Sequence, residues 1–196
     1  LDVLPVSGTR RNNATERFLH VDASQAGGND SLTVGAGDHI AALGLGDDEA
    51  GFGLGTAAVL GDVGTVSLTR STGALHLSPD GSTAGRTDDV TPSDGNDWVL
   101  LGPGADTLAA GQGDTLILAD NGVIDVTAAE TTLTSTDDAT GGADSVTSGT
   151  GHDWVNLGEG AEWAQLGAGD KLVLGDNGVI RIAGTRHTPT PTLIPH

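Results

Sequence analysis

Residues 141–178 read GGADSVTSGTGHDWVNLGEGAEWAQLGAGDKLVLGDNG, and this stretch decides the fold. Its glycines recur every nine residues, and two earlier stretches repeat that step. The three series are Gly28, Gly37, Gly46 and Gly55; Gly95, Gly104 and Gly113; and Gly142, Gly151, Gly160 and Gly169. A fixed period of this kind is typical of proteins built from stacked structural repeats. We therefore divide the chain into three blocks, residues 28–64, 86–122 and 142–178.

Each nine-residue row carries apolar residues at alternating positions. Those that stand four positions after a row start are Leu32, Ala41, Ala50, Val59, Val90, Val99, Leu108, Ile117, Val146, Val155, Ala164 and Val173. The second block starts at Arg86, in the place of a glycine. Alternation of apolar and polar residues predicts a short strand with one buried face. A second glycine, usually seven positions after the row start, predicts a tight turn between strands.

Two rows return the chain to its starting side, so strands two rows apart are expected to stack in parallel. The segments between the blocks read as strand, turn, strand, for example GTVSLTRSTGALHLSPD at 64–80. We therefore predict one all-β domain over residues 1–196, a right-handed parallel β-roll or β-solenoid with interspersed β-hairpin connectors. The connectors are residues 1–27, 65–85, 123–141 and 179–196. Recurrent glycines and Asp-Gly pairs argue against helices.

The composition excludes several classes of function. The chain has 27 acidic residues against 8 Lys and Arg, a formal net charge of −19. Nucleic acid is therefore not an expected partner, because phosphate binding needs a basic surface. Without cysteine there is no disulfide and no thiol catalysis, and no stretch approaches a membrane span of about 20 apolar residues. No catalytic motif such as G-x-S-x-G or H-E-x-x-H occurs, so we expect no enzyme.

Ten acidic residues at the turns are the candidate metal ligands. On one edge of the stack we expect the pairs Asp30–Asp48, Asp88–Asp106 and Asp144–Glu162, and on the other edge Asp97–Asp114 and Asp153–Asp170. Carboxylates at the strand spacing of about 4.8 Å repel each other unless a cation lies between them. Calcium suits such a site, because it takes many oxygen ligands and glycine-rich turns offer backbone carbonyls. The alternative is a solvated acidic surface whose Asp and Asn side chains stabilise turns.

Several of these turns resemble the nonapeptide of RTX (repeats-in-toxin) proteins, G-G-x-G-x-D-x-U-x. The resemblance is carried by GGNDSL (27–32), DGNDWV (94–99), GPGADTL (102–108), GGADSV (141–146) and GTGHDWV (149–155). It covers the three blocks and implies a β-roll, several calcium ions in the turns, secretion, and folding triggered outside the cell. The first glycine of the family pattern is mostly Val, Leu, Phe or Ala here, so we expect calcium at some of the five pairs only.

Three tryptophans stand next to acidic turn positions. Trp98 and Trp154 alternate with the inward positions of their rows, so both should point away from the interior of the roll, and Trp163 does likewise on the opposite sheet. Exposed tryptophans often mark contact sites. A connector hairpin that covers them is the interpretation we favour over a free binding platform.

These patterns predict a calcium-binding structural or adhesive protein, and the resemblance to RTX proteins implies that it is secreted and lies outside the cell or on its surface. We expect it to associate head to tail with further copies, as a homo-oligomer or filament, because a stack of strands leaves open edges at its ends. Two alternatives stay open. One is a calcium-stabilised module that binds a cell-surface or glycan ligand through the tryptophans, and the other is the RTX export region of a secreted enzyme.

Overall fold

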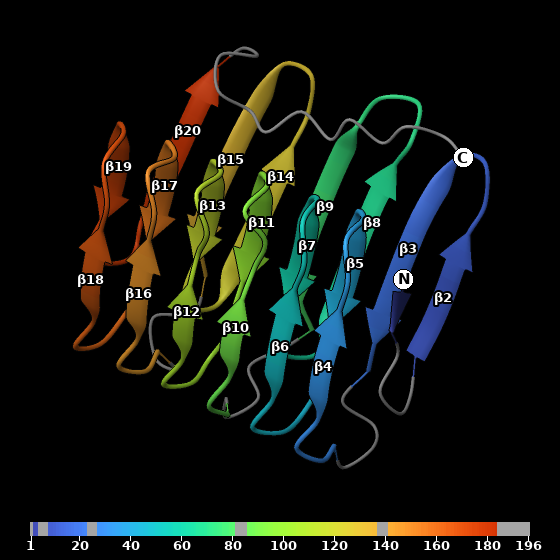
Figure 1. The fold of residues 1–196 in the computed structure, drawn as a ribbon, viewed down its shortest axis with the longest axis horizontal. Coiled ribbons are helices and arrows are strands. Elements are labelled where there is room, and N and C mark those ends of the chain that lie inside the picture. Colours follow the sequence, from blue (N-terminus) through green and yellow to red (C-terminus); the bar gives the residue numbers. More distant parts are fainter. Residues whose placement is uncertain (1, 4–7, 23–26, 81–85, 137–140, 184–196) are drawn as a thin grey trace.

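The described part of the chain is all β. The computed structural model describes residues 2–3, 8–22, 27–80, 86–136 and 141–183, and within these ranges it contains strands and turns but no helix. The strands form three sheets (Figure 1). The all-β prediction is therefore confirmed.

The blocks supply two parallel sheets. The first, here called the central sheet, contains β1 (Asp2–Val3), β5 (His39–Ala42), β7 (Ala57–Leu60), β11 (Asp97–Leu100), β13 (Thr115–Leu118), β17 (Asp153–Asn156) and β19 (Lys171–Leu174) in that order. The second, here called the outer parallel sheet, contains β4 (Ser31–Val34), β6 (Glu49–Phe52), β10 (Asp89–Thr91), β12 (Thr107–Ala109), β16 (Ser145–Ser148) and β18 (Trp163–Leu166).

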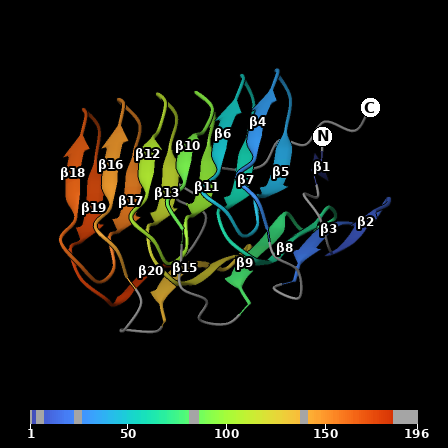
Figure 2. The ribbon, with the colours of Figure 1, turned by 90° about the horizontal axis from the view of Figure 1, so that it is seen from below.

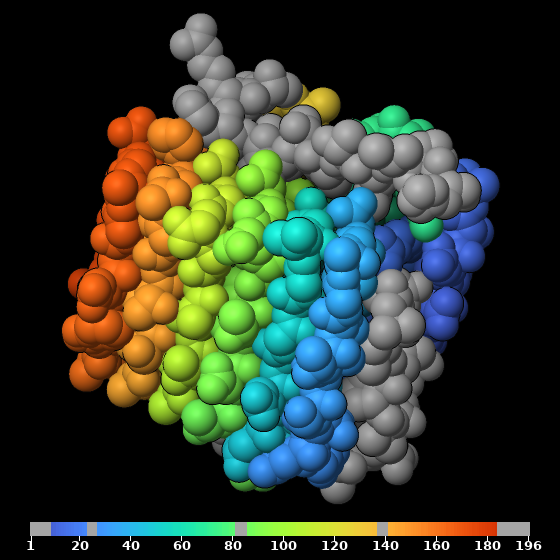
Figure 3. All heavy atoms as spheres, in the orientation of Figure 1, coloured from blue at the N-terminus to red at the C-terminus, as the bar shows by residue number. Residues whose placement is uncertain are grey.

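The chain alternates between these two sheets row by row. From β4 in the outer parallel sheet it passes to β5 in the central sheet, then back to β6 beside β4 and to β7 beside β5. Each row therefore pairs in parallel with the row two further on. Pairing continues across the block boundaries, where β6 pairs with β10 and β7 with β11. In the space-filling view the rows lie side by side, from blue at β4 to red at β18 (Figure 3).

The connectors form the third sheet, here called the hairpin sheet. It is antiparallel throughout and contains β2 (Gly8–Asn12), β3 (Glu16–Val21), β8 (Gly64–Thr69), β9 (Ala74–Pro79), β14 (Gly122–Val126), β15 (Glu130–Ser135) and β20 (Val179–Ala183) in that order. Neighbouring hairpins also pair with each other, through β3–β8 and β9–β14. The hairpin prediction is confirmed for the first three connectors, whereas residues 184–196 of the fourth lie outside the described residues.

The three sheets stack as layers with the central sheet in the middle (Figure 2). A hydrophobic core between the two parallel sheets contains Val59, Val90, Val99, Leu108, Ile117, Val146 and Val155, among others. A second core, between the central sheet and the hairpin sheet, contains Leu60, Val66, Leu77, Trp98, Leu100, Ile124 and Leu133, among others. The central strands are thus buried on both faces, as their nearly continuous apolar sequences require.

The inward positions that the repeat predicts line the core between the parallel sheets, except in the last rows. Ala164 of β18 and Val173 of β19 are exposed, because β18 and β19 are the last strands of their sheets. Leu32, in the first row, is half-buried and packs against that core.

Candidate metal centre

Six acidic residues lie at one edge of the outer parallel sheet, where each strand begins. This column, here called the acidic edge, consists of Asp30, Asp48, Asp88, Asp106, Asp144 and Glu162. The strand register brings them together: Asp89 lies opposite both Glu49 and Thr107, so the preceding Asp88 lies between Asp48 and Asp106. Because each strand pairs with the next, the acids predicted as three separate pairs form one continuous ladder.

A hydrogen bond joins each step of the ladder from Asp30 to Asp144. The Oδ1 atom of Asp48 accepts the backbone N–H of Asp30 at 2.7 Å, and the Oδ1 atom of Asp88 accepts the N–H of Asp48 at 3.0 Å. The same bond runs from Asp88 to Asp106 and from Asp106 to Asp144, at 2.8 Å each. In Asp48, Asp88, Asp106 and Asp144, one carboxyl oxygen therefore fixes the turn, which leaves the second for another partner.

That second oxygen has no partner in the described protein. The buried atoms that accept no hydrogen bond include Oδ2 of Asp48, Asp88, Asp106 and Asp144, and Oε1 of Glu162. Leaving a buried polar atom without a partner costs roughly 1–3 kcal/mol, and more for a charged group. These buried oxygens therefore need either protons or bound cations.

Two further aspartates join the acidic edge, and the sequence-based list of metal ligands lacks both. Asp62 and Asp120 stand in the last row of the first and second blocks, at a position where most rows have glycine. Both oxygens of Asp62 are buried without a hydrogen-bond partner. Asp120 accepts bonds from the backbone N–H groups of Glu159 and Gly142, at 2.6 and 3.2 Å. The glycine-to-aspartate change is the sequence signal that identifies them.

Burial raises the pKa of these carboxyl groups, and the neighbouring acids raise it further. The pKa is about 9 for Asp106, about 8 for Asp62 and Asp144, about 7 for Asp88 and about 6 for Asp120. For Asp62 the neighbours are Asp88 and Asp48, while Arg86 acts in the opposite direction. Without a cation, part of this ladder therefore carries protons at neutral pH.

Glycines bring backbone close to the unpartnered oxygens. A Cβ atom on Gly61 would lie 2.6 Å from Oδ2 of Asp88 and would overlap the carbonyl oxygen of Leu101. A Cβ atom on Gly102, whose φ is +101°, would lie 2.7 Å from Oδ2 of Asp62. Glycine at these two positions therefore keeps open the space in which carboxylate and carbonyl oxygens approach one another.

The opposite edge, here called the second edge, is built differently. It is formed by the turns that enter the central sheet, and the register places Asp97 opposite Ala57 and Thr115. The N–H of Asp97 donates to the backbone carbonyl of Asp114 at 3.1 Å. The carboxyl group of Asp97 accepts the N–H of Ala57 at 2.6 Å. Asp114 instead accepts the N–H of His152 at 2.8 Å. The predicted pair Asp97–Asp114 is therefore wrong, because Asp114 stands one residue before the position that faces Asp97.

The predicted pair Asp153–Asp170 is wrong for the same reason. Asp153 lies opposite Lys171, and its Oδ2 atom is 2.6 Å from the lysine Nζ atom. The side chain of Asp170 is 97% exposed, and its Oδ2 atom is 3.6 Å from His152 Nδ1. The carboxyl group of Asp170 thus points to solvent and not toward Asp153.

The donor set of the acidic edge fits a hard cation such as calcium. Its free atoms are carboxylate oxygens, flanked by backbone carbonyls, and such oxygens are the ligands of calcium. Within the described residues no three acidic or histidine side chains converge closely enough to hold a metal by themselves. Backbone carbonyls and water would therefore have to complete any coordination shell.

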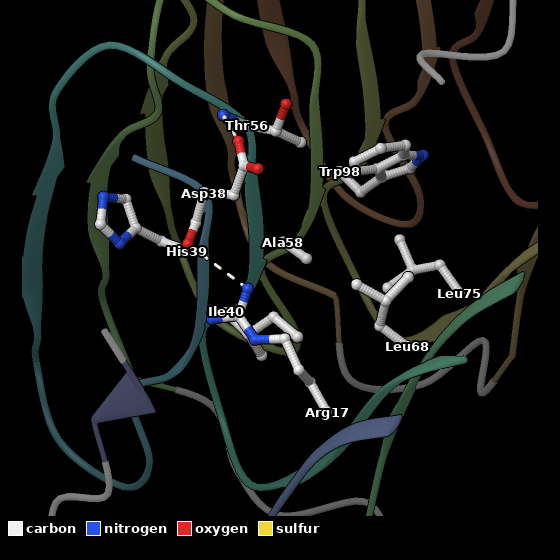
Figure 4. Close-up of a pocket in the computed structure, with 9 residues that line it drawn as sticks. All are labelled: Arg17, Asp38, His39, Ile40, Thr56, Ala58, Leu68, Leu75 and Trp98. Carbon is white, nitrogen blue, oxygen red and sulfur yellow. Dashed lines mark hydrogen bonds between the residues drawn. The ribbon is translucent and has the colours of Figure 1, made fainter. Parts of the chain in front are cut away.

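The tryptophans lie apart from the acidic edge. Trp98 and Trp154 are buried in the core beneath the hairpin sheet, so the prediction that a hairpin covers the tryptophans is confirmed for these two. Trp98 lines a small, mostly apolar pocket with Ile40 and Leu68 (Figure 4). There Arg17 Nη1 donates a hydrogen bond to the carbonyl of Asp38 at 3.4 Å. Trp163 remains 52% exposed.

No protein-family model, curated protein or solved structure matches this chain. Among the described residues, no helix is long and apolar enough to span a membrane.

Proposed function

We propose that the chain is a calcium-binding structural or adhesive protein of the extracellular space, and that its blocks form a parallel β-roll of the RTX kind. The observation that carries this proposal is the row of buried carboxylate oxygens without partners along the acidic edge. Asp48, Asp88, Asp106, Asp144 and Glu162 would supply oxygen ligands, and Asp62 and Asp120 would add more where a hairpin leaves the stack.

The chemistry of the ligands favours calcium over other metals. Magnesium demands nearly octahedral geometry and keeps much of its water, whereas calcium tolerates irregular sets of oxygens. Transition metals prefer imidazole or thiolate ligands, and the acidic edge has neither. A bound ion would neutralise carboxylates that otherwise repel each other across one strand spacing.

The electrostatics give the ions a structural role. The chain has a formal net charge of −19 and only 8 basic residues, so self-repulsion opposes the compact state. A ligand that binds only the folded form at a hundredfold excess over its Kd adds about 2.7 kcal/mol per site. A few such sites would supply the net stability of an ordinary domain, about 5–15 kcal/mol.

Architecture supports a structural role over a glycan-binding one. Two of the three candidate tryptophans are buried. By contrast, the last three described strands carry exposed apolar side chains, namely Trp163, Leu172, Val173 and Val179. Their strands β18, β19 and β20 are the last of their sheets in the described chain. Open edges of this kind pair with further strands unless they are covered, which supports head-to-tail association.

Circular dichroism of metal-free protein, before and after millimolar calcium, tests the proposal. We expect a largely disordered spectrum without calcium at low salt and a β spectrum with it. Asp88→Asn and Asp106→Asn should raise the calcium concentration at the midpoint of folding. Asp170→Asn, which alters an exposed carboxylate outside the ladder, is the matched control and should leave it unchanged. A β spectrum that is identical in rigorously metal-free buffer and in calcium would contradict the proposal.

A further inference from the structure

The two edges of the stack differ in what faces their carboxylates. Along the acidic edge every row contributes an acid. Along the second edge the equivalent column reads His39, Ala57, Asp97, Thr115, Asp153 and Lys171. Its two carboxyl groups are separated by a threonine. Asp153 has donors on both oxygens, and Asp97 accepts the N–H of Ala57 and lies within hydrogen-bond distance of the Ser93 hydroxyl.

Lys171 provides the clearest case. Its Nζ atom lies 2.5 Å from the carbonyl oxygen of Gly151, 2.6 Å from Oδ2 of Asp153 and 3.3 Å from the carbonyl oxygen of Gly149. An ammonium group has three N–H donors and no acceptor, so these three oxygens use all of its donors. The other oxygen of Asp153 accepts the N–H of Thr115 at 3.0 Å. A positive charge is thus already seated among a carboxylate and two turn carbonyls.

Ser93 fills the space beside Asp97, which is the other carboxyl group of the second edge. It stands where most rows have glycine, and its Oγ atom lies 2.5 Å from the carbonyl oxygen of Gly55 and 3.0 and 3.1 Å from the two oxygens of Asp97. The hydroxyl also accepts the N–H of Gly95 at 2.8 Å. The side chain therefore occupies the space between a turn carbonyl and the carboxyl group.

His39, in strand β5, shows the same pattern in the first row of the second edge. It takes the position that Asp97 and Asp153 hold in later rows, and its Nε2 atom lies 2.9 Å from the carbonyl oxygen of Gly35. A turn carbonyl is again contacted by a side chain of the protein.

We propose that the second edge is closed by the protein's own side chains, and that the Lys171 ammonium is a built-in cation that holds Gly149, Gly151 and Asp153 together in place of a metal ion. The inference rests on the proposed calcium binding. It implies that metal ions bind at the acidic edge only. In the folded protein, strands β17 and β19 would be held together at this turn without a metal ion, whereas the acidic edge would depend on the ion.

The argument is one of shared ligands. A calcium ion at this turn would need the same carboxylate and carbonyl oxygens that Nζ now contacts, and two cations cannot share them. Asp153 is buried and the Lys171 side chain is only 13% exposed, so the ammonium is not readily displaced into water. Removal of the charge should therefore leave a vacant oxygen cluster that a divalent ion can enter.

Calcium titration calorimetry, in a buffer where wild type and variants are folded, tests the inference. Lys171→Met keeps the length of the side chain and removes its charge, and we expect it to bind one more calcium ion per chain than the wild type. Lys171→Arg, which keeps a cation, should bind the wild-type number. Asp153→Asn should remove the additional ion from Lys171→Met and leave the stoichiometry of the otherwise wild-type chain unchanged.

Ser93→Gly is an independent variant, because it restores the common turn residue and frees Asp97, and it should also gain one ion. If neither Lys171→Met nor Ser93→Gly gains an ion, the inference is overturned. A wild type that binds no calcium would instead contradict the proposed function, because the inference concerns the difference between variant and wild type.

Discussion

At the scale of the residue, the buried carboxyl groups fall into two kinds. A buried carboxyl group needs hydrogen-bond donors, a proton or a cation. Asp153 has donors on both oxygens, from Thr115 and Lys171. Asp62 has none on either oxygen. Asp153 of the second edge is therefore satisfied by the protein, whereas Asp62 of the acidic edge depends on a proton or an ion from the surrounding solution.

The stability of the metal-free protein should accordingly fall as the pH rises. The folded-state pKa values of Asp88, Asp62 and Asp106 are about 7, 8 and 9, above the ordinary carboxyl pKa, so the folded protein binds more protons than the unfolded chain between about pH 4 and 9. This contribution is complete below the ordinary pKa and is lost as the pH passes through 7 to 9. Urea unfolding of metal-free protein at pH 5, 7 and 9 measures it, provided that the salt is high enough for the chain to fold.

Calcium should reverse this trend, because it competes with protons for the same oxygens. At saturating calcium the decline between pH 7 and 9 should disappear, and the apparent calcium affinity should rise with pH. Asp62→Asn should reduce the decline in metal-free protein and weaken calcium binding, whereas Asp170→Asn should do neither. A free energy of unfolding that stays constant from pH 5 to 9 without metal would mean that the ladder does not take up protons on folding.

At the scale of the element, strands and hairpins are predictable from the sequence, but their stacking is predictable only in part. The period of nine fixes the turns, and alternation fixes which side chains of a strand face inward, as Val99 and Trp98 show. Pairing of rows two apart follows from those two facts. That the hairpins pair with one another into a continuous third sheet does not follow, because it depends on long-range contacts such as β9 with β14.

The candidate site shows the same division. Asp48, Asp88, Asp106 and Asp144 are predictable because they keep one position in the row. The pairing of the second edge is not, since a shift of one residue reverses the side of the chain to which a side chain points. Lys171, which replaces an acid at the regular position, is the residue whose role only the three-dimensional arrangement reveals.

The tryptophan under the hairpin sheet should matter more for stability than its exposed counterpart. Trp98 is 2% exposed and packs in the core between the central sheet and the hairpin sheet, so Trp98→Ala should cost about 3–5 kcal/mol of unfolding free energy. Trp163→Ala, at 52% exposure, is the control and should cost less than about 1 kcal/mol. Thermal or urea unfolding in calcium measures both, and equal losses would contradict the layered packing of the hairpins.

At the scale of the whole molecule, the exposed end formed by β18, β19 and β20 should promote association. Light scattering over a concentration series in calcium should show growth beyond the monomer. Leu172→Lys, which places a charge on this end, should reduce it. Leu54→Lys is the control, because Leu54 is 67% exposed but lies in the turn between β6 and β7. A protein that remains monomeric at high concentration would contradict head-to-tail association and leave calcium binding untouched.

The way the hairpins are inserted has a geometric consequence for growth by duplication. Each complete unit of block and hairpin adds two strands to the central sheet, two to the outer parallel sheet and two to the hairpin sheet, as β10 to β15 do. Neighbouring strands are about 4.8 Å apart in every sheet, so all three layers lengthen by the same increment of about 10 Å per unit. A hairpin sheet with a different number of strands per unit would no longer stay aligned with the central sheet. Duplication of a whole unit therefore extends the molecule at constant cross-section, with every new apolar face already matched to a partner.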